Sequence, residues 1–232
     1  VEVIVLSRND ADSGLRIFNS IEAAGLPITR AAFTDGGDPL PYLDPFVCDL
    51  FLSNETDAVR AALARGCPAA QVLNPPEAFD EEPTGPVKIA FDGDAVLFDD
   101  ESERVFQDQG LDAFLAREAE LAEVPMTPGP FKPFLTALGR VQAAAGADQN
   151  VIRTALVTAR SAPATKRVVK TLRTWDVRVD ESFFLGGVEK AGVLAALNAH
   201  IFFDDQKTHL VPTSSVLPSV HIPFGITNTT SP

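Results

Sequence analysis

Four short segments of this chain carry carboxylates, a hydroxyl and an amine in an order that could hold a phosphate and a metal ion. They are Phe91-Asp92-Gly93-Asp94, Leu156-Val157-Thr158, Lys190 after Gly186-Gly187, and Phe202-Phe203-Asp204-Asp205. Each ends or follows an apolar run typical of a strand, and open α/β sheets place functional residues where the carboxyl ends of strands meet the next loops. We therefore predict that these residues converge on one magnesium-dependent phosphoryl-transfer site.

The first segment contains the residues predicted to react. Asp92 is the predicted nucleophile, because a carboxylate can form an aspartyl-phosphate and so divide one difficult step into two. Asp94 lies two positions further on, where it could donate a proton to the leaving oxygen and later accept one from the hydrolytic water. Gly93 between them lets the backbone approach a phosphate closely.

The other segments are predicted to bind the phosphate and the cation. Thr158 offers a hydroxyl and, with Ala159, backbone amides to a phosphate oxygen, while Lys190 offers a point charge. Mg²⁺ prefers a near-octahedral oxygen shell and usually keeps waters, so a few carboxylates and a phosphate oxygen suffice. The predicted ligands of this Mg²⁺ cofactor are Asp92, Asp94, Asp204 and Asp205. Each motif alone has another interpretation, since an Asp-x-Asp can form a turn and paired aspartates can cap a helix.

The elements that must position these residues alternate along the chain. Strands are predicted at 3–6, 28–33, 47–52, 70–73, 87–91, 153–157, 183–185 and 201–203, and helices at 15–24, 55–65, 101–122, 134–144, 164–174 and 191–197. Alternation of strands and helices predicts an α/β fold with a doubly wound, mostly parallel, Rossmann-like sheet.

The chain is predicted to have two main parts and a tail. Residues 86–227 form the predicted catalytic domain, with a helical cap inserted at about 99–150. Residues 1–80 form a predicted non-catalytic half that is incomplete at its N-terminus, a Pro-rich acidic linker follows at 74–86, and residues 228–232 form a polar tail.

The first half resembles part of the second when it is moved by about 151 positions. Val3–Asn54 then falls on Thr154–Asp205 without a gap. This predicts a degenerate half-repeat, with chance and general α/β patterning as alternatives. At this offset the first half has Ser7, Pro39, Ser53 and Asn54 where the second has Thr158, Lys190, Asp204 and Asp205. The first half would therefore lack the ammonium and both late carboxylates.

Composition narrows the class of protein. The 232 residues include 19 basic and 32 acidic side chains, a formal charge of −13. This charge predicts that neither nucleic acid nor an anionic membrane is a partner. No apolar run reaches the ~18 residues that span a bilayer, and the start lacks the basic flank of a signal peptide, so a cytoplasmic location is predicted. Cys48 and Cys67 are predicted to be inert thiols.

Longer motifs resemble a known family. They are Lys88–Phe98, Gly129–Phe134, Arg153–Arg160, Phe184–Gly187 and Ile201–Gln206, with Leu6–Asp10, Gly14–Ser20 and Thr29–Phe33 in the first half. The four core motifs resemble the haloacid-dehalogenase-like phosphohydrolases, and the longer ones are similar to the bacterial branch of the cytosolic 5′-nucleotidase family. The resemblance covers nearly the whole chain. It implies a Mg²⁺-dependent phosphatase of nucleoside 5′-monophosphates, with the roles given above for Asp92, Asp94, Thr158, Lys190, Asp204 and Asp205.

Substrate contacts are predicted in and near the cap. Phe98, Phe106 and Phe131 are candidates to stack on a base, and Arg160 to contact phosphate or ribose. The alternative is that the aromatic rings fill the core of the cap. The three histidines show no partner pattern and are predicted to be structural; they are His200, His209 and His221.

Three other functions fit some of the motifs. A phosphatase of a sugar phosphate or another small monoester would use the same core motifs, because the fold does not fix the leaving group. A receiver-type phospho-acceptor also pairs acids with Thr and Lys, but its paired acids come first along the chain, whereas here they come last. A scaffold role fits the first half alone.

Overall fold

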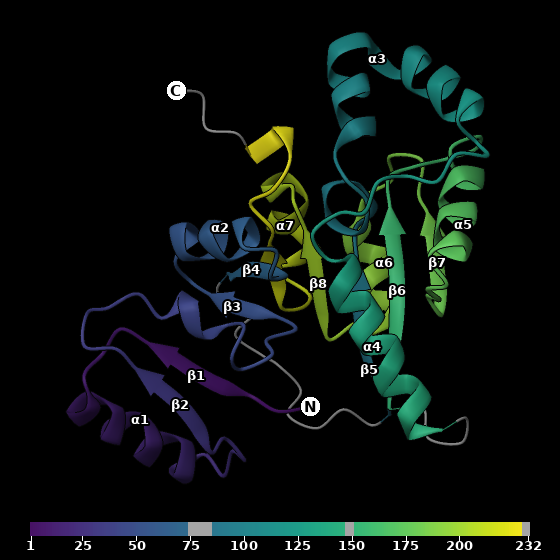
Figure 1. Cartoon of the computed structure of the whole chain (residues 1–232). Coiled ribbons are helices and arrows are strands. Elements are labelled where there is room, and N and C mark those ends of the chain that lie inside the picture. Colours follow the sequence, from purple (N-terminus) through teal and green to yellow (C-terminus); the bar gives the residue numbers. More distant parts are fainter. Residues whose placement is uncertain (74–84, 147–150, 229–232) are drawn as a thin grey trace. The chain divides into compact units, whose positions relative to one another are not determined.

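The computed structural model describes residues 1–73, 85–146 and 151–228 (Figure 1). It divides into two compact units, Val1–Cys48 and Asp49–Pro232. The predicted boundary near residue 80 does not coincide with this division, because the strands next to Asp49 belong to the sheet of the larger unit. Most of the predicted linker at 74–86, the end of the predicted cap and most of the predicted tail lie outside the described residues.

The smaller unit contains two parallel strands and one helix. Its elements are β1 (Ile4–Ser7), α1 (Ala11–Ala23), β2 (Arg30–Phe33) and a 3-10 turn at Leu40–Tyr42. The side chain of Asp10 accepts a hydrogen bond from the backbone N–H of Ser13 at 2.7 Å, which satisfies one of the free amides at the start of α1. Gly14 lets the helix lie close to β2, since a Cβ there would be 2.6 Å from the ring of Phe33.

The larger unit is built on a seven-stranded sheet with the order β3-β4-β9-β8-β5-β6-β7. Its strands are β3 (Phe51–Ser53), β4 (Ala69–Val72), β5 (Val87–Phe91), β6 (Ile152–Thr158), β7 (Glu181–Phe184), β8 (Ile201–Asp204) and β9 (Ser219–His221). All neighbouring strands are parallel except β4 and β9. The predicted α/β class with a mostly parallel, Rossmann-like sheet is therefore confirmed.

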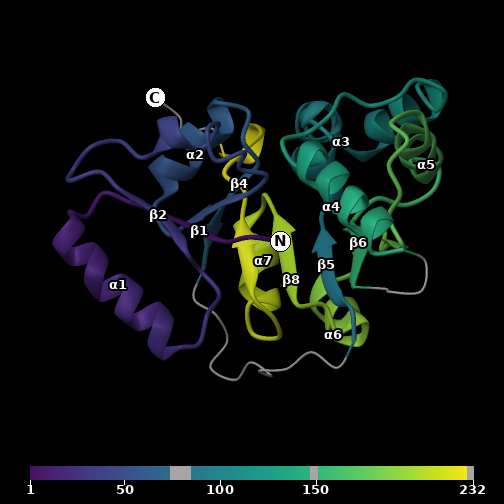
Figure 2. The same ribbon diagram turned by 60° about the horizontal axis from the view of Figure 1, so that its bottom comes forward.

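Helices cover both faces of this sheet (Figures 1 and 2). They are α2 (Thr56–Ala64), α3 (Glu101–Glu120), α4 (Lys132–Ala145), α5 (Thr165–Thr174), α6 (Lys190–Leu197) and α7 (Lys207–Thr213). The rings of Phe91 and Phe203 pack with residues of α4 and α5 in one apolar cluster. Phe202, the neighbour of Phe203 on β8, packs with residues of α6 and α7 in a second cluster. Successive residues of one strand thus serve opposite faces of the sheet.

Some predicted elements differ from the structure. The strand predicted at 47–52 is found only at Phe51–Ser53. Val47 has a φ of 53°, which is not an extended conformation, so the strand cannot begin there. The long helix α3 is interrupted at Gly110, where φ is 83° and ψ is −178°. Helix α7 and strand β9, which follow Asp205, were not predicted from the sequence; β9 lies between β8 and β4 in the sheet.

Backbone geometry repeats at the offset found in the sequence. β1 and β2 pair from Ile4 with Arg30, and β6 and β7 pair from Ala155 with Glu181, which is the same register. The amide of Thr34 donates to the carbonyl of Ser7, and that of Leu185 to the carbonyl of Thr158. Positive φ angles also recur in the pairs Gly25 and Asp176, Asp35 and Gly186, Gly36 and Gly187, and Val47 and Asn198. The two segments therefore share local backbone geometry as well as apolar patterning.

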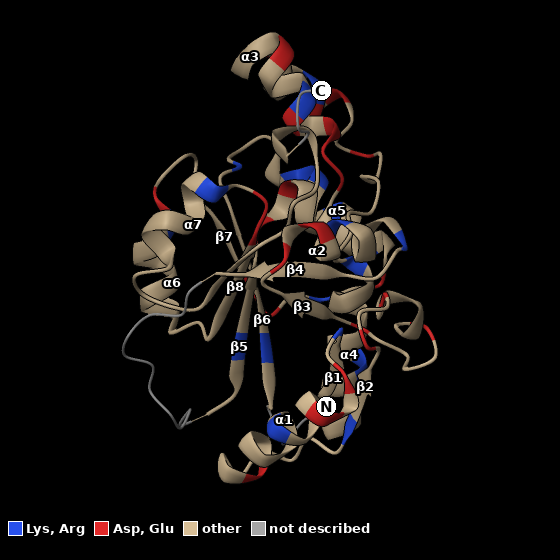
Figure 3. Cartoon of the chain, turned by 90° about the vertical axis from the view of Figure 1, so that its left-hand side faces the viewer, with Lys and Arg blue, Asp and Glu red and all other residues tan. Residues whose placement is uncertain are grey.

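Charged residues of the larger unit are unevenly distributed. In Figure 3 the strands of the large sheet are mostly tan, and red segments lie beyond their carboxyl ends, around the base of α3. Helix α3 lies beyond the arrowhead of β6 (Figure 1).

None of the helices in the described part of the chain is long and apolar enough to cross a membrane.

Candidate active site

Three adjacent strands end in predicted site residues. Asp92 follows β5, Thr158 ends β6 and Asp204 ends β8, and the two outer strands are the hydrogen-bonded neighbours of β5. The strands are parallel, so their carboxyl ends meet at one edge of the sheet. Gly93 lies against this edge, since a Cβ there would be 3.2 Å from Thr158 Oγ1. Ala159 is exposed at the start of the next loop.

Lys190 joins two of the carboxylates. Its Nζ lies 2.9 Å from Asp92 Oδ1 and 2.6 Å from Asp204 Oδ2, and all three side chains are buried. Lys190 is the first residue of α6, where Glu189 and the preceding loop deliver it to the edge of the sheet. Burial alone would lower the pKa of Lys190, but the carboxylates of Asp92 and Asp204 outweigh burial and raise it. The amine is therefore held as an ammonium.

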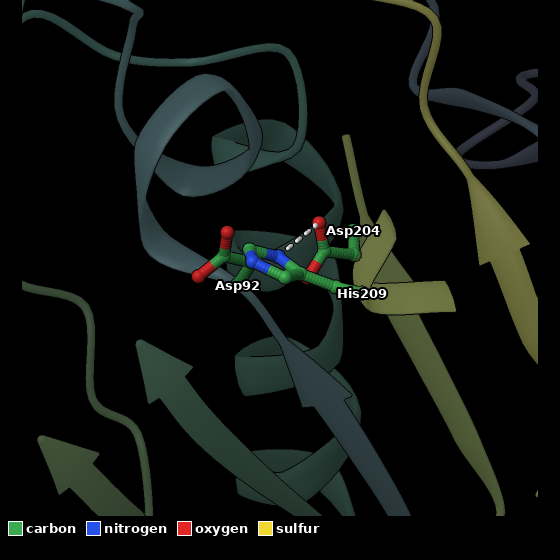
Figure 4. Close-up of side chains that lie close together, drawn as sticks. All are labelled: Asp92, Asp204 and His209. Carbon is green, nitrogen blue, oxygen red and sulfur yellow. Dashed lines mark hydrogen bonds and ion pairs between the residues drawn. The ribbon is translucent and has the colours of Figure 1, made fainter. Parts of the chain in front are cut away.

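His209 is a site residue that the sequence analysis missed. Its Nδ1 lies 3.1 Å from Asp204 Oδ2. Ligand atoms of Asp92, Asp204 and His209 lie within 4.8 Å of one another, and Figure 4 draws the three side chains with the contact between His209 and Asp204 dashed. The predicted structural role of His209 is therefore incomplete. The available signal was its place in the first turn of a short helix directly after Asp204-Asp205, but α7 itself was not predicted.

The two late aspartates have different environments. Burial would raise the pKa of Asp204, but Lys190 and His209 more than offset this and lower it. For Asp205, burial and then the charges of Asp92 and Asp204 outweigh the weaker opposing effects of Thr227 and Lys190 and raise the pKa to about 9. Burial also raises the pKa of Asp92 to about 6, against the opposing effect of Lys190.

The donor set fits a divalent cation. Asp205 Oδ2 accepts a hydrogen bond from Thr227 Oγ1 at 2.8 Å, but its Oδ1 is buried and has no hydrogen-bond partner among the described residues. The Lys190 ammonium pairs with two of the three buried carboxylates, those of Asp92 and Asp204. A cation with oxygen preference would partner the orphaned oxygen and offset the remaining negative charge. Mg²⁺ is compatible with these ligands.

Asp94 is fixed by an arginine that was predicted to touch the substrate. Arg160 donates from Nε to Asp94 Oδ2 at 2.8 Å and from Nη2 to Asp94 Oδ1 at 2.6 Å. Its third nitrogen, Nη1, donates to Glu118 Oε2 at 2.6 Å, and only 2% of the Arg160 side chain is exposed. Arg160 is thus paired within the protein. Glu118, which is on α3, is a second residue that the sequence analysis did not single out.

The candidate aromatic residues lie in two environments. Phe98 and Phe131 are fully buried in the apolar cluster around Phe91, and neither ring has an exposed face on which a base could stack in this structure. The structure thus gives them the alternative role of packing the core. Phe106 on α3 is 45% exposed and lies edge-on to Phe114, with ring centroids 6.3 Å apart.

Comparison with known proteins gives the family. Residues 1–229 match a family model described as 5′-nucleotidase. The chain is 38% identical over 214 residues to human cytosolic 5′-nucleotidase 1B. The match covers 90% of this chain and 35% of the human protein, so the chain spans about a third of that relative's length. No solved structure matches. The predicted resemblance is thus confirmed, and the chain belongs to the 5′-nucleotidase family, which has a haloacid-dehalogenase-like fold.

Proposed function

We propose that this chain is a Mg²⁺-dependent 5′-nucleotidase that hydrolyses nucleoside 5′-monophosphates to nucleoside and phosphate. The family match supports this, as does the human relative, which is named a cytosolic 5′-nucleotidase. The observation that carries the proposal is the convergence of Asp92, Thr158 and Asp204 at the ends of adjacent strands, with the Lys190 ammonium between the two carboxylates. Bound Mg²⁺, held by Asp92, Asp204 and Asp205, would supply positive charge to the phosphate oxygens.

In the first step, a carboxylate oxygen of Asp92 forms a bond to phosphorus as the bond to the 5′ oxygen breaks. Asp94, as the general acid, gives a proton to that oxygen, which leaves as the nucleoside hydroxyl. In the second step, Asp94 accepts a proton from a water, the water oxygen attacks the aspartyl-phosphate, and phosphate leaves while Asp92 is restored. Lys190 and Thr158 bind phosphate oxygens in both steps.

The proposal includes Asp94 as a further ligand of Mg²⁺.

The proposal also assigns roles to the two parts of the chain. Residues 86–227 would be catalytic, with the segment at about 99–150 as the cap. Residues 1–80 would be a non-catalytic, degenerate copy, as the shared backbone geometry supports. A cytoplasmic location is supported by the name of the human relative, and the net charge of −13 argues against nucleic acid as a partner.

The test replaces the proposed nucleophile. Asp92→Asn is expected to reduce hydrolysis of a nucleoside 5′-monophosphate by at least ~10³-fold with Mg²⁺ present, because the aspartyl-phosphate can no longer form. Asp108→Asn, an exposed aspartate on α3, is the matched control and should retain full activity. Undiminished activity of Asp92→Asn would disprove the mechanism. A panel that includes sugar phosphates tests the substrate, since equal rates on both classes would contradict a nucleotidase.

A further inference from the structure

A chain of four charged side chains, three of them buried and Asp94 half-buried, connects the cap helix α3 with Asp94. Arg160 binds both carboxylate oxygens of Asp94, and Glu118 binds Arg160. The other oxygen of Glu118, Oε1, accepts from Arg167 Nη1 at 2.8 Å and from Ser102 Oγ at 2.8 Å. Glu118 is 1% exposed, so its two arginine partners balance its charge almost without help from water.

The second half of α3 makes two contacts with Arg160. Besides the ion pair with Glu118, the guanidinium of Arg160 lies over the ring of Phe114, 5.5 Å from its centroid. Both residues follow the break at Gly110. The loop that contains Arg160 is held to the sheet as well, because its amide donates to Thr158 Oγ1 at 3.3 Å. Arg160 is therefore fixed from the cap on one side and from β6 on the other.

We propose that Glu118 is a positioning residue, which holds the Arg160 fork so that Asp94 is aimed at the leaving oxygen of the substrate. A bidentate guanidinium fixes the plane of a carboxylate as well as its position. A misdirected acid costs rate even when substrate still binds, since proton transfer requires hydrogen-bond reach. The cap would thus contribute to proton transfer through Glu118 without touching the reacting atoms. This inference rests on the proposed role of Asp94.

The test separates proton transfer from all other steps by changing one atom of the substrate. It uses the nucleoside 5′-monophosphate that the wild type hydrolyses fastest and the analogue in which sulfur replaces the bridging 5′ oxygen. A thiolate leaves without a proton, whereas an alkoxide needs one from Asp94. Release of nucleoside is measured in single turnovers with excess enzyme and Mg²⁺, so that only the first step is followed.

Glu118→Gln keeps the size of the side chain and can still accept from one arginine, but it loses the charge that holds Arg160. We expect it to slow release from the oxygen ester by about tenfold or more, part of the 10²–10⁴-fold contributed by a general acid, and to change the sulfur ester by about twofold at most. Arg160→Lys keeps the charge but not the fork, and it should show the same selective loss.

The matched control is Glu101→Gln. Glu101 is also on α3 and lies 3.5 Å from Arg167, but it does not contact Arg160. Both esters should react as in the wild type. The ratio of the two rates comes from one enzyme preparation, so partial unfolding of a variant lowers both rates and leaves the ratio unchanged.

Equal losses on both esters, or no loss on either, in Glu118→Gln would overturn the positioning role. If the wild type itself released nucleoside from neither ester, the proposed function would fail instead, and the two failures are therefore distinct. An equal selective loss in Glu101→Gln would also overturn the inference, since it would assign the effect to α3 in general.

Discussion

Replacing Asp205 by asparagine should stabilise the metal-free protein, although Asp205 is a proposed metal ligand. Its pKa is raised from 3.8 to about 9, chiefly by burial and then by the charges of Asp92 and Asp204. Because the folded-state pKa lies above the unfolded-state value, the folded protein holds an additional proton between those two values. The contribution of Asp205 to the free energy of unfolding of the metal-free wild type therefore falls as pH rises from about 4 through about 9.

The magnitude follows from the size of this pKa shift. At pH 7 the difference from 3.8 is roughly three units, and each unit corresponds to 1.36 kcal/mol, so the penalty is about 4 kcal/mol at most. Asparagine is neutral and so avoids this penalty. Its side-chain NH₂ group would take the place of Oδ1, however, and would lack a hydrogen-bond acceptor there, at a cost of about 1–3 kcal/mol. A net gain of about 1–3 kcal/mol remains. For a chain of this size, each kcal/mol of added stability raises Tm by roughly 2–4 °C.

The assay is thermal unfolding in chelator at pH 6 and pH 8.5, with and without added Mg²⁺. The gap in Tm between Asp205→Asn and the wild type should widen at the higher pH, and Mg²⁺ should stabilise the wild type more than the variant. Asp204→Asn is the matched control and should have the opposite sign. It removes a carboxylate already paired with Lys190 and His209, which should cost about 3–5 kcal/mol.

Two outcomes for Asp205→Asn would refute the role given to Asp205, and a third, in the control, would refute the pairing of Asp204. One is a metal-free Asp205→Asn protein that is less stable than the wild type at pH 8.5. The other is equal stabilisation of both proteins by Mg²⁺, which would mean that Asp205 is not a ligand. If Asp204→Asn and Asp205→Asn shifted Tm in the same direction, the assignment of the Lys190 ammonium to Asp204 would be wrong.

Two further predictions concern the rest of the site and the core. Lys190→Met should lower the free energy of unfolding by about 3–5 kcal/mol, because it leaves two buried carboxylates without their ammonium. It should also lower nucleotidase activity by orders of magnitude. A Lys190→Met variant that unfolds at the same temperature as the wild type would contradict this prediction. Gly129→Ala should destabilise by at least about 2 kcal/mol, since its Cβ would lie 2.2 Å from the carbonyl oxygen of Phe98. Gly139→Ala, in α4 with open space around its Cβ, should be neutral or stabilising by up to about 1 kcal/mol, and equal Tm values for the two alanine variants would contradict the packing argument.

The sequence predicted the edge of the sheet well because the signals there are local. Asp92 directly follows the apolar strand β5, and Asp204 is the last residue of the apolar strand β8. Strand ends of a parallel sheet lie together whatever the intervening chain does, so two local patterns were enough to predict a shared site. The same reasoning predicted Lys190, which begins the helix after a turn with two glycines.

The residues that the sequence analysis missed depend on partners far along the chain. Glu118 meets Arg160 and Arg167, which are 42 and 49 positions away, and on α3 it resembles the other acidic residues of that helix. Only the folded packing shows that it is buried while Glu120 is exposed. Phe98 and Phe131 show the converse problem, because an aromatic residue near a motif has the same sequence signal whether it faces a ligand or the core.

The shared register of β1–β2 and β6–β7 bears on how such a site can arise or be lost. In both segments the strand ends in a hydroxyl residue that accepts a hydrogen bond from the amide two positions further on: Ser7 Oγ accepts from Asn9, and Thr158 Oγ1 accepts from Arg160. The turns before Pro39 and Lys190 also match, because Asp35 and Gly36 have positive φ angles, as Gly186 and Gly187 do. Exchanging a handful of side chains on this shared main-chain template would therefore be enough to add or remove the proposed catalytic groups.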